Sequence, residues 1–412
     1  MSNKFFYFRR NIVRSFISLE EALEILDEKV NSLEVEEVDL FNALNKVLAE
    51  DVYSTINNPP FNKSAMDGYA LISEDGFIDN KLEVIDKVYA GESSEKVISK
   101  NTAIKIMTGA PIPQGANCVI KQEDVIADDN SIIVKKEVSE NQNVCFIGED
   151  ISKGELLIKS GKKLNYSDIG IIASSGISKI KVYKKPKIAF FSTGDEVTDL
   201  GSNLEFGKIY NSNKFSIVCR LLELGYEVDT IDHINDNYVE IGRIIKETSK
   251  NVDLIITTGG VSVGEKDLLK EAIKSIDGEM LFWKITIKPG SAMLCSKINN
   301  CIVISLSGNP TASLTTFELL VKTTLNKMCG NKEVKINREK AILKDGIIKK
   351  GSKHRFLRGY FEIIDCKQYV SITQKKSGNG ILKSALNSNC IVEVNPNDED
   401  IKEGNIVDII KL

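Results

Sequence analysis

Histidine is almost absent from this chain: only two of its 412 residues are His, at positions 233 and 354. Its eight cysteines include no C-x-x-C pair. Zinc sites and disulfide scaffolds depend on such clusters, so neither is expected, and the thiols should be reduced. The basic, Phe-rich start from Met1 to Ser15 is interrupted by Arg9 and Arg10. It therefore predicts neither a signal peptide nor a membrane span, but a short extension of a cytoplasmic protein.

Positive charge is not in excess either. The formal net charge is -4, with 27% charged and 42% hydrophobic residues. This composition is typical of a globular protein and offers no broad basic field for nucleic acid, so any anion-binding site must be local. A chain of this length is too long for one ordinary core and should form roughly two to four domains.

The pattern of residue types changes several times along the chain. Residues 18–49 have apolar spacing of three and four and predict two short helices, with Ser18 and Glu21 placed as a capping box. Residues 57–150 consist of β-branched runs broken by Pro, Gly and Asn, which favours a β-rich insertion. We predict four domains: an N-terminal mixed domain (1–54 and 151–183), the inserted β-rich domain (55–150), an α/β domain (184–331) and a C-terminal β-barrel-like domain (332–412).

Strands alternate with helices after residue 184, which predicts a central doubly wound, mostly parallel sheet with helices on both faces. Ligands of such folds bind beyond the carboxyl ends of the strands. Four polar, glycine-containing loops should meet at that edge. They are Thr193-Gly194-Asp195-Glu196, Gly259-Gly260-Val261-Ser262, Lys288-Pro289-Gly290 and Ser307-Gly308-Asn309-Pro310.

The segment Asp253–Asp267 is the most informative of these. The apolar run 254–256 predicts a strand buried on both faces, and Gly259 and Gly260 let the backbone turn and present N–H groups to an anion. Asp267 precedes a predicted helix at 268–276. The alternative is a tight turn with Asp267 as a helix cap.

The residue types at this edge suit phosphate chemistry. The carboxylates Glu196, Asp236 and Asp267 could hold Mg²⁺, which prefers one or two carboxylates together with water and phosphate oxygens. Lys284 and Lys288, with the loop N–H groups, suit the phosphate or oxyanion itself. A metal beside an anion clamp is typical of phosphoryl or nucleotidyl transfer. Solvated surface charge is the alternative for each residue taken alone.

Seven short motifs occur along the chain in a fixed order. Together they resemble the molybdopterin molybdenumtransferase family, the molybdenum insertases related to the E domain of gephyrin, over roughly residues 18–412. The motifs are SAMDGYA (64–70), MTGAPIPQGA (107–116), GED (148–150), STGDE (192–196), TGGVSVGEKD (258–267), KPG (288–290) and GNP (308–310).

The resemblance implies a fold and a reaction. The fold is an elongated four-domain subunit in a homodimer, with the β-rich insertion as a lid and an α/β domain that shares the fold of the molybdopterin adenylyltransferase, itself a candidate partner. The reaction converts adenylylated molybdopterin and molybdate into molybdenum cofactor and AMP, assisted by Mg²⁺. Neither nucleic acid nor membrane is implied as a partner.

The resemblance also implies roles for particular residues. Asp67, Glu196 and Asp267 would be catalytic, and Glu196, Asp236 and Asp267 would bind the metal. Asp67 and Thr108 would reach the site across the dimer interface. Two alternatives stay open: a plain turn at Asp67-Gly68, and Asp150 as a cap of the segment from Ile151. The substrate-binding set would be Thr108, Gly109, Asp150, Thr193, Gly194, Gly259, Gly260, Ser262, Lys284, Lys288, Pro289, Gly290, Gly308, Asn309 and Pro310.

Some positions depart from the family pattern. Cys145 stands where the family usually has Arg, Ser291-Ala292 replaces Lys-Pro, Ser307 replaces Pro, and Asn117 replaces Asp. Two cationic groups are therefore missing near the predicted anion site, where each charge-assisted hydrogen bond contributes about 1.5 to 3 kcal/mol. Three hypotheses follow: an insertase that uses molybdate or tungstate, a non-catalytic paralog that binds the pterin or a partner protein, and an enzyme that transfers adenylyl groups to molybdopterin.

Overall fold

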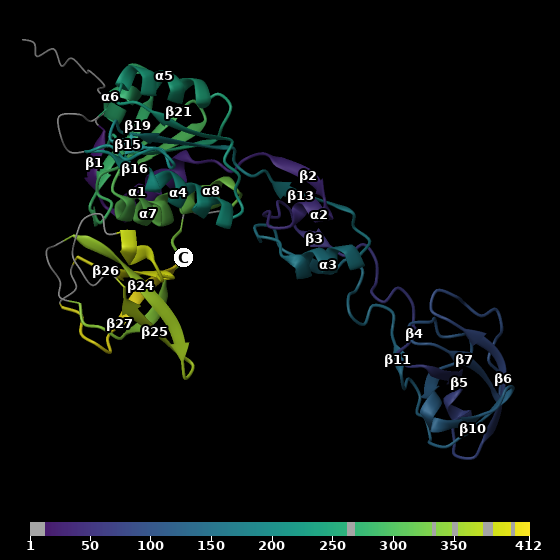
Figure 1. Ribbon diagram of the computed structural model, residues 1–412. Helices are drawn as coiled ribbons and strands as arrows, with labels where there is room; N and C mark the ends of the chain where they lie inside the picture. Colours follow the sequence, from purple (N-terminus) through teal and green to yellow (C-terminus); the bar gives the residue numbers. More distant parts are fainter. Residues whose placement is uncertain (1–12, 262–267, 332–334, 348–352, 374–381, 397–399) are drawn as a thin grey trace, which may run out of the picture. The chain divides into compact units, whose positions relative to one another are not determined.

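A computed structural model describes residues 13–261, 268–331, 335–347, 353–373, 382–396 and 400–412. The chain forms two compact units (Figure 1): Met1–Val35 with Tyr183–Leu412, and Glu36–Val182. Ser262 and Asp267, two of the predicted site residues, lie outside the described residues.

The first unit contains a seven-stranded sheet. Its strand pairs are parallel except the two that β21 makes with its neighbours. The predicted mostly parallel sheet is therefore confirmed, with one antiparallel strand that the sequence did not reveal. In sheet order the strands are β1 (Arg14–Ile17), β19 (Glu279–Ile285), β21 (Leu294–Ile298), β22 (Cys301–Leu306), β18 (Leu254–Thr258), β14 (Ile188–Thr193) and β17 (Thr230–Ile234).

Helices cover both faces of this sheet (Figure 1). In β18, Leu254 and Ile256 belong to one buried core and Ile255 to the other, which explains why this strand is apolar at every position. α1, α4 and the helices after β22 contribute to the first core, and α5 and α6 to the second. The helices are α1 (Leu19–Lys29), α4 (Ser212–Glu223), α5 (Tyr238–Thr248), α6 (Leu268–Ser275), α7 (Pro310–Thr316) and α8 (Lys322–Met328).

The N-terminal segment belongs to the first unit. β1 pairs in parallel with β19, and Leu23 and Leu26 of α1 are buried in the core beneath the sheet. The Ser18 hydroxyl caps α1 by accepting a hydrogen bond from the Glu21 N–H at 3.0 Å, which is one of the two hydrogen bonds of the predicted capping box. The predicted domain boundaries stay predictions. The contacts described above attach residues 14–29 to the α/β sheet.

Some predicted elements differ in extent. The helix expected from Leu40 is only α2 (Leu40–Ala43), since Asn45 adopts a positive φ of 64° that a helix does not allow. β17 begins at Thr230, where pairing with β14 starts. Between α7 and α8 lies a π-helical turn, Phe317–Val321, preceded by threonine hydroxyls that bond to backbone carbonyls four residues earlier.

The C-terminal strands close into a barrel, as the sequence predicts. β24 pairs with both β25 and β26, and β23 and β27 complete the circle. β20 (Ile287–Lys288) runs parallel to β24 and joins the barrel to the α/β domain. The barrel strands are β23 (Glu339–Leu343), β24 (His354–Ile364), β25 (Lys367–Ile372), β26 (Cys390–Val394) and β27 (Ile406–Lys411).

The second unit is β-rich. Its main sheet has the order β8-β5-β7-β6-β10-β9, and α3 (Tyr166–Ser174), with a complete capping box at Asn165, shares a core with two short strand pairs, β12-β3 and β13-β2. The six strands are β5 (Gly68–Leu71), β6 (Lys81–Val88), β7 (Thr102–Ile106), β8 (Cys118–Lys121), β9 (Val125–Ala127) and β10 (Ser131–Val134). The short strands are β2 (Val35–Asp39), β3 (Val52–Tyr53), β4 (Lys63–Ser64), β11 (Val144–Cys145), β12 (Leu156–Ile158) and β13 (Lys179–Tyr183).

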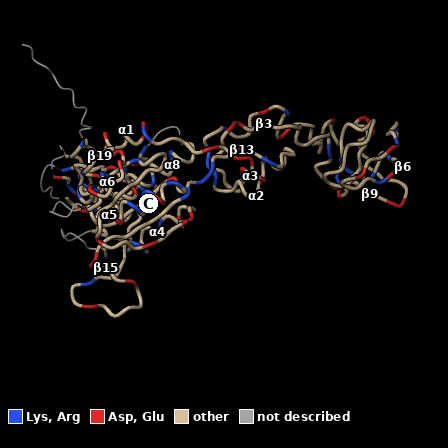
Figure 2. The backbone as a smooth tube through the Cα atoms, turned by 90° about the horizontal axis from the view of Figure 1, so that it is seen from above, with Lys and Arg blue, Asp and Glu red and all other residues tan. Residues whose placement is uncertain are grey.

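Basic and acidic residues are interspersed along both units (Figure 2). All eight cysteines are free thiols. Within the described ranges, none of the helices is long and apolar enough to cross a membrane.

Candidate functional site

The carboxyl ends of β14, β18, β22 and β19 lie at one edge of the sheet, because these strands are parallel to one another. The Gly259 N–H donates to the carbonyl of Leu306 at 3.1 Å, which joins the loops after β18 and β22. The Thr193 hydroxyl lies 3.5 Å from the carbonyl of Thr258. Three of the predicted loops thus meet at this edge.

Glycine is required at two of the positions where these loops touch, Gly259 and Gly260. Gly259 has a φ of 97°, and a Cβ there would lie 2.4 Å from the carbonyl oxygen of Thr193. Gly260 has a φ of 67°, and its Cβ would lie 3.1 Å from the Thr193 hydroxyl. A Cβ on Gly308 would approach the Cα of Gly259 at 3.6 Å. The structure therefore brings Thr193, Gly259, Gly260 and Gly308 together as one backbone surface.

The loop before α7 is fixed by hydrogen bonds. Asn309 caps the helix by accepting from the N–H groups of Thr311 and Ala312 at 3.1 and 3.2 Å. The Asn213 amide of α4 donates to the Gly308 carbonyl at 2.8 Å. Ser307, which replaces the family's proline, accepts from the Asn309 N–H at 3.2 Å. A side-chain hydrogen bond thus restrains the loop where a proline ring would.

Carboxylates flank the loops after β14 and β17. Glu196 folds over Gly194, whose φ of 127° would bring a Cβ within 2.6 Å of the Glu196 Oε2. The Asp236 N–H donates to Oδ1 of Asp195 at 3.1 Å. Glu196 and Asp236 belong to no three-ligand cluster among the described residues, and Asp267 lies outside them. The metal site at Glu196, Asp236 and Asp267 stays a prediction.

A polar network below this edge was missed by the sequence analysis. The Asn211 amide donates to the Ser192 hydroxyl at 2.8 Å, and that hydroxyl lies 3.0 Å from Nδ1 of His233. The signal was a Ser in an otherwise apolar strand, which requires a buried partner. The network fixes the end of β14, from which Thr193 and Gly194 continue.

Lys284, at the carboxyl end of β19, is only 6% exposed, whereas Lys288 in β20 is exposed. A Cβ on Gly290, which follows Pro289, would lie 2.6 Å from a methyl carbon of Thr316, so this turn presses on α7. The Ser291 hydroxyl donates to the Ile285 carbonyl at 2.6 Å. Ser291 thus tightens the turn but supplies no cation in place of the family's lysine.

In the second unit, Asp67 and Thr108 are in direct contact. Both the N–H and the hydroxyl of Thr108 donate to Oδ1 of Asp67 at 2.7 Å, and these hydrogen bonds lower the pKa of Asp67. Gly68 is the first residue of β5, and a Cβ there would lie 1.9 Å from the Ile120 carbonyl. Asp67 is thus the last residue of a bend that leads directly into β5. Gly109 donates to the Ser64 carbonyl at 2.8 Å.

Two further predicted positions lie in this unit. The Asp150 carboxylate accepts from the Asn58 amide at 3.2 Å, and Ile151 forms a β-bridge with Asn58, so Asp150 caps no helix. Cys145, which replaces the family's arginine, is the antiparallel partner of Lys63. Paired residues share one face of a ladder, so the Lys63 side chain emerges beside the thiol.

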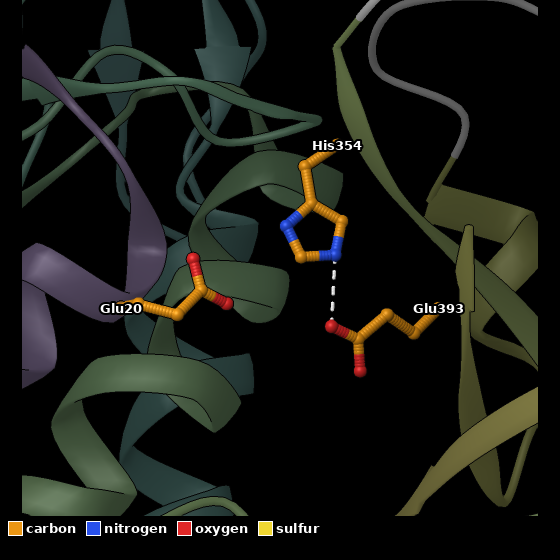
Figure 3. Close-up of side chains that lie close together, drawn as sticks. All are labelled: Glu20, His354 and Glu393. Atoms are coloured by element: carbon orange, nitrogen blue, oxygen red, sulfur yellow. Dashed lines mark ion pairs between the residues drawn. The ribbon is translucent and has the colours of Figure 1, made fainter. Parts of the chain in front are cut away.

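A separate cluster lies between α1 and the barrel (Figure 3). Glu20, His354 and Glu393 place one ligand atom each within 4.8 Å of the others, and it is the only such group of three that the described residues form. His354 and Glu393 are buried, and His354 Nε2 lies 2.8 Å from Glu393 Oε1. By composition it could hold a metal ion.

Arg338 gives this cluster a different character. Its guanidinium donates to both oxygens of Glu393, one at 3.0 Å through Nη2, and lies 3.8 Å from Glu20. A cation already neutralises the carboxylates, and both Glu393 oxygens have partners. We interpret the cluster as an ion network that fastens the barrel to α1.

Family models match most of the chain. The MoeA N-terminal region (domain I and II) matches residues 17–176, a probable molybdopterin binding domain matches 189–327, and the MoeA C-terminal region (domain IV) matches 340–412. The molybdopterin molybdenumtransferase of Staphylococcus aureus strain MSSA476 is 35% identical over 402 residues, which cover 96% of each chain. This chain belongs to the molybdopterin molybdenumtransferase family. It is a transferase of molybdenum cofactor biosynthesis.

Other relatives agree with this assignment. The Staphylococcus epidermidis molybdopterin molybdenumtransferase is also 35% identical over 402 residues. A crystal structure of the molybdopterin biosynthesis MoeA protein from Pyrococcus horikoshii superposes with a TM-score of 0.80 at 32% identity and covers 96% of this chain and 98% of that one. The resemblance inferred from the seven motifs is therefore confirmed, and so is the multidomain fold.

Proposed function

We propose that this protein inserts molybdate into adenylylated molybdopterin and releases AMP and molybdenum cofactor. The observation that carries the proposal is the contiguous backbone surface of Thr193, Gly259, Gly260 and Gly308. The glycine positions of these loops let the backbone approach the pyrophosphate that joins the pterin to AMP closely, although the Gly259 N–H itself donates to the Leu306 carbonyl. Lys284 and Lys288 supply the neighbouring cations for the phosphate oxygens.

The reaction breaks a phosphorus–oxygen bond at the oxygen that bridges the two phosphate groups of that pyrophosphate. Negative charge develops on the leaving AMP phosphate, so cations and N–H groups placed before the reaction lower the barrier. In the second unit, the depressed pKa of Asp67 keeps its carboxylate ionised, and Thr108 fixes its orientation. Asp67 is proposed to act on the substrate in this ionised form.

Mg²⁺ would supply further charge neutralisation at the pyrophosphate. The donor types fit, because hard carboxylate oxygens of Glu196 and Asp236 occur on the adjacent loops after β14 and β17. The Asp236 N–H donates to Asp195, so a third carboxylate lies at the same place. We propose Glu196 and Asp236, with Asp267, as the metal ligands.

The test is AMP release from adenylylated molybdopterin, measured with molybdate, with tungstate and with neither anion. We expect release that depends on an anion and on Mg²⁺. Substrate binding without AMP release in both anion arms would refute the proposal and favour the non-catalytic paralog. Formation of adenylylated molybdopterin from ATP and molybdopterin would instead support the adenylyltransferase hypothesis.

We also propose a homodimer in the cytoplasm, with the molybdopterin adenylyltransferase as the candidate supplier of substrate. What supports these proposals is the family membership. Analytical ultracentrifugation of the full chain tests the dimer. A monomer that retains full activity would contradict it.

A further inference from the structure

β1 (Arg14–Ile17) lies beside β19 and reaches the predicted active-site edge. Ser15 pairs with Trp283, and Ile17 pairs with Ile285, so Phe16 lies opposite Lys284 at the carboxyl end of β19. Phe16 is 59% exposed, whereas the Lys284 beside it is 6% exposed. An exposed aromatic ring at this point covers a buried cation.

Two aromatic rings surround the Lys284 ammonium. Its Nζ lies 3.6 Å from the centroid of the Trp283 ring and 5.3 Å from that of Phe16. The two rings contact each other edge to face, with centroids 6.3 Å apart and planes inclined by 64°. Both distances fall within the range of cation–π attraction. We call Phe16 and Trp283 the aromatic clamp.

The backbone explains how this arrangement arises. Lys284 has a φ of 62° and Phe16 a φ of 57°, so both residues of the opposed pair are left-handed. Successive side chains of a regular strand point to opposite faces, and a left-handed residue breaks that alternation. Lys284 can therefore fold onto the ring of its neighbour Trp283. Such strain costs free energy and persists where surrounding contacts fix it, typically at functional sites.

Lys284 also lies at the predicted functional edge. The Lys284 N–H donates to the Met293 carbonyl at 2.9 Å, at the start of the turn that contains Lys288 and Gly290. Trp283 pairs with Leu294 of β21, Leu294 with Ser305 of β22, and Ser305 with Thr257 of β18. These four residues form one row across the sheet. Lys284 is thus one residue beyond this row, on the edge where the glycine loops meet.

We propose that Phe16 and Trp283 are positioning residues that hold the Lys284 ammonium at the carboxyl edge, where it contacts a phosphate or oxyanion of the substrate. The inference rests on the proposed function. Aromatic rings solvate a cation without neutralising it, so the ammonium keeps its charge for the substrate. A carboxylate partner would instead compete with the phosphate. The N-terminal segment, through β1, thereby completes the site.

The first test is the kinetics of AMP release by Phe16→Ala, Phe16→Leu and Phe16→Tyr. We expect Phe16→Ala and Phe16→Leu to raise KM about tenfold with little change in kcat, because a substrate contact made in both ground and transition states is weakened. Phe16→Tyr, which keeps the ring, should restore the wild-type KM. Phe16→Leu with wild-type kinetics would overturn the proposal, because leucine keeps the apolar cover and lacks the ring.

A double-mutant cycle separates positioning from folding. If Phe16 acts through Lys284, Phe16→Ala should have almost no further effect in a Lys284→Met background. Equal effects in both backgrounds would overturn the inference. Phe215→Ala, on α4 and 44% exposed, is the matched control for loss of a partly exposed ring and should leave KM unchanged.

A chemical readout keeps this test independent of the proposed function. Brief reductive methylation followed by peptide mass spectrometry measures the accessibility of the Lys284 amine. Phe16→Ala should be methylated there several-fold faster than the wild type, and Phe215→Ala should not. If the wild type releases no AMP, the proposed function fails, yet faster methylation still supports the clamp. Unchanged methylation of Lys284 in Phe16→Ala overturns the clamp, whatever the activity.

Discussion

Glu393→Gln should weaken the C-terminal barrel at neutral pH. Glu393 is 4% exposed and lies between the Arg338 guanidinium and His354. Burial alone would raise the pKa of Glu393, but the bonds from His354 and Arg338 outweigh burial and lower it to about 2. Glutamine has almost the same shape and cannot carry the charge, so the change removes the electrostatics and keeps the packing.

The magnitude follows from linkage. A carboxyl group whose pKa falls from 4.5 to about 2 on folding contributes about 3 kcal/mol to stability, because each pKa unit corresponds to about 1.4 kcal/mol. Since the folded pKa is depressed, this stability is complete above pH 4.5. It is lost as the pH falls from about 4.5 to about 2. Glu393→Gln should lose about 3 kcal/mol at pH 7 and should lack this acid-dependent step.

Hydrogen exchange suits the measurement, because a multidomain chain does not unfold in a single two-state transition. Amides of β24 and β26 report the opening of the barrel, after correction for the intrinsic exchange rate at each pH. Glu362→Gln is the matched control on β24, since Glu362 pairs with Lys344 at 2.7 Å but is 37% exposed. It should cost at most about 1 kcal/mol. Equal protection of Glu393→Gln and wild type at pH 7 would refute the reasoning, as would an acid-dependent step of the same size in both.

Three further predictions concern the site. Gly259→Ala should destabilise the α/β domain by at least about 2 kcal/mol, because its Cβ would clash with the Thr193 carbonyl. Gly201, with a φ of 87°, has open space around its Cβ position, so the control Gly201→Ala should cost only about 1 kcal/mol. Thermal or urea unfolding measures both. Lys63→Met should raise the KM for substrate about tenfold if Lys63 substitutes for the arginine missing at Cys145, and an unchanged KM would mean that it does not. Removal of divalent cations with EDTA should abolish AMP release and leave the melting temperature within about 2 °C; restored activity with Mg²⁺ checks the first part, and unfolding in EDTA would indicate a structural metal instead.

The carboxyl edge could be predicted because its signals are local. A buried strand is an apolar run, its end is marked by Gly and polar residues, and parallel strands place their ends at one edge whatever the tertiary detail. Gly259, Gly260 and Gly308 were therefore identified from their place after β18 and β22. The contact between Thr193 and Gly259 follows from the same rule, since β14 and β18 are neighbours.

Contacts between distant segments could not be predicted in this way. Phe16 and Lys284 meet only because β1 adds to the sheet edge beside β19, and no periodicity in either segment specifies that pairing. Glu20, His354 and Glu393 likewise come from α1, β24 and β26. The left-handed backbone conformation of Lys284 could not be predicted from the sequence either, since lysine has no preference for positive φ.

The departures from the family pattern can now be separated by their physical effect. Ser307 and Ser291 each make a hydrogen bond that restrains the backbone of their loops, so these replacements preserve shape. The charge that is lost at Ser291 and Cys145 is not restored by either bond. Besides Lys288, two cations lie near these positions: Lys284, which contacts the aromatic clamp, and Lys63, which pairs with Cys145. The protein therefore keeps the geometry expected of its family and differs in the distribution of positive charge. Selection between molybdate and tungstate, two oxyanions of the same charge, should then depend on the fixed geometry, whereas affinity for either should depend on the two lysines and fall with ionic strength.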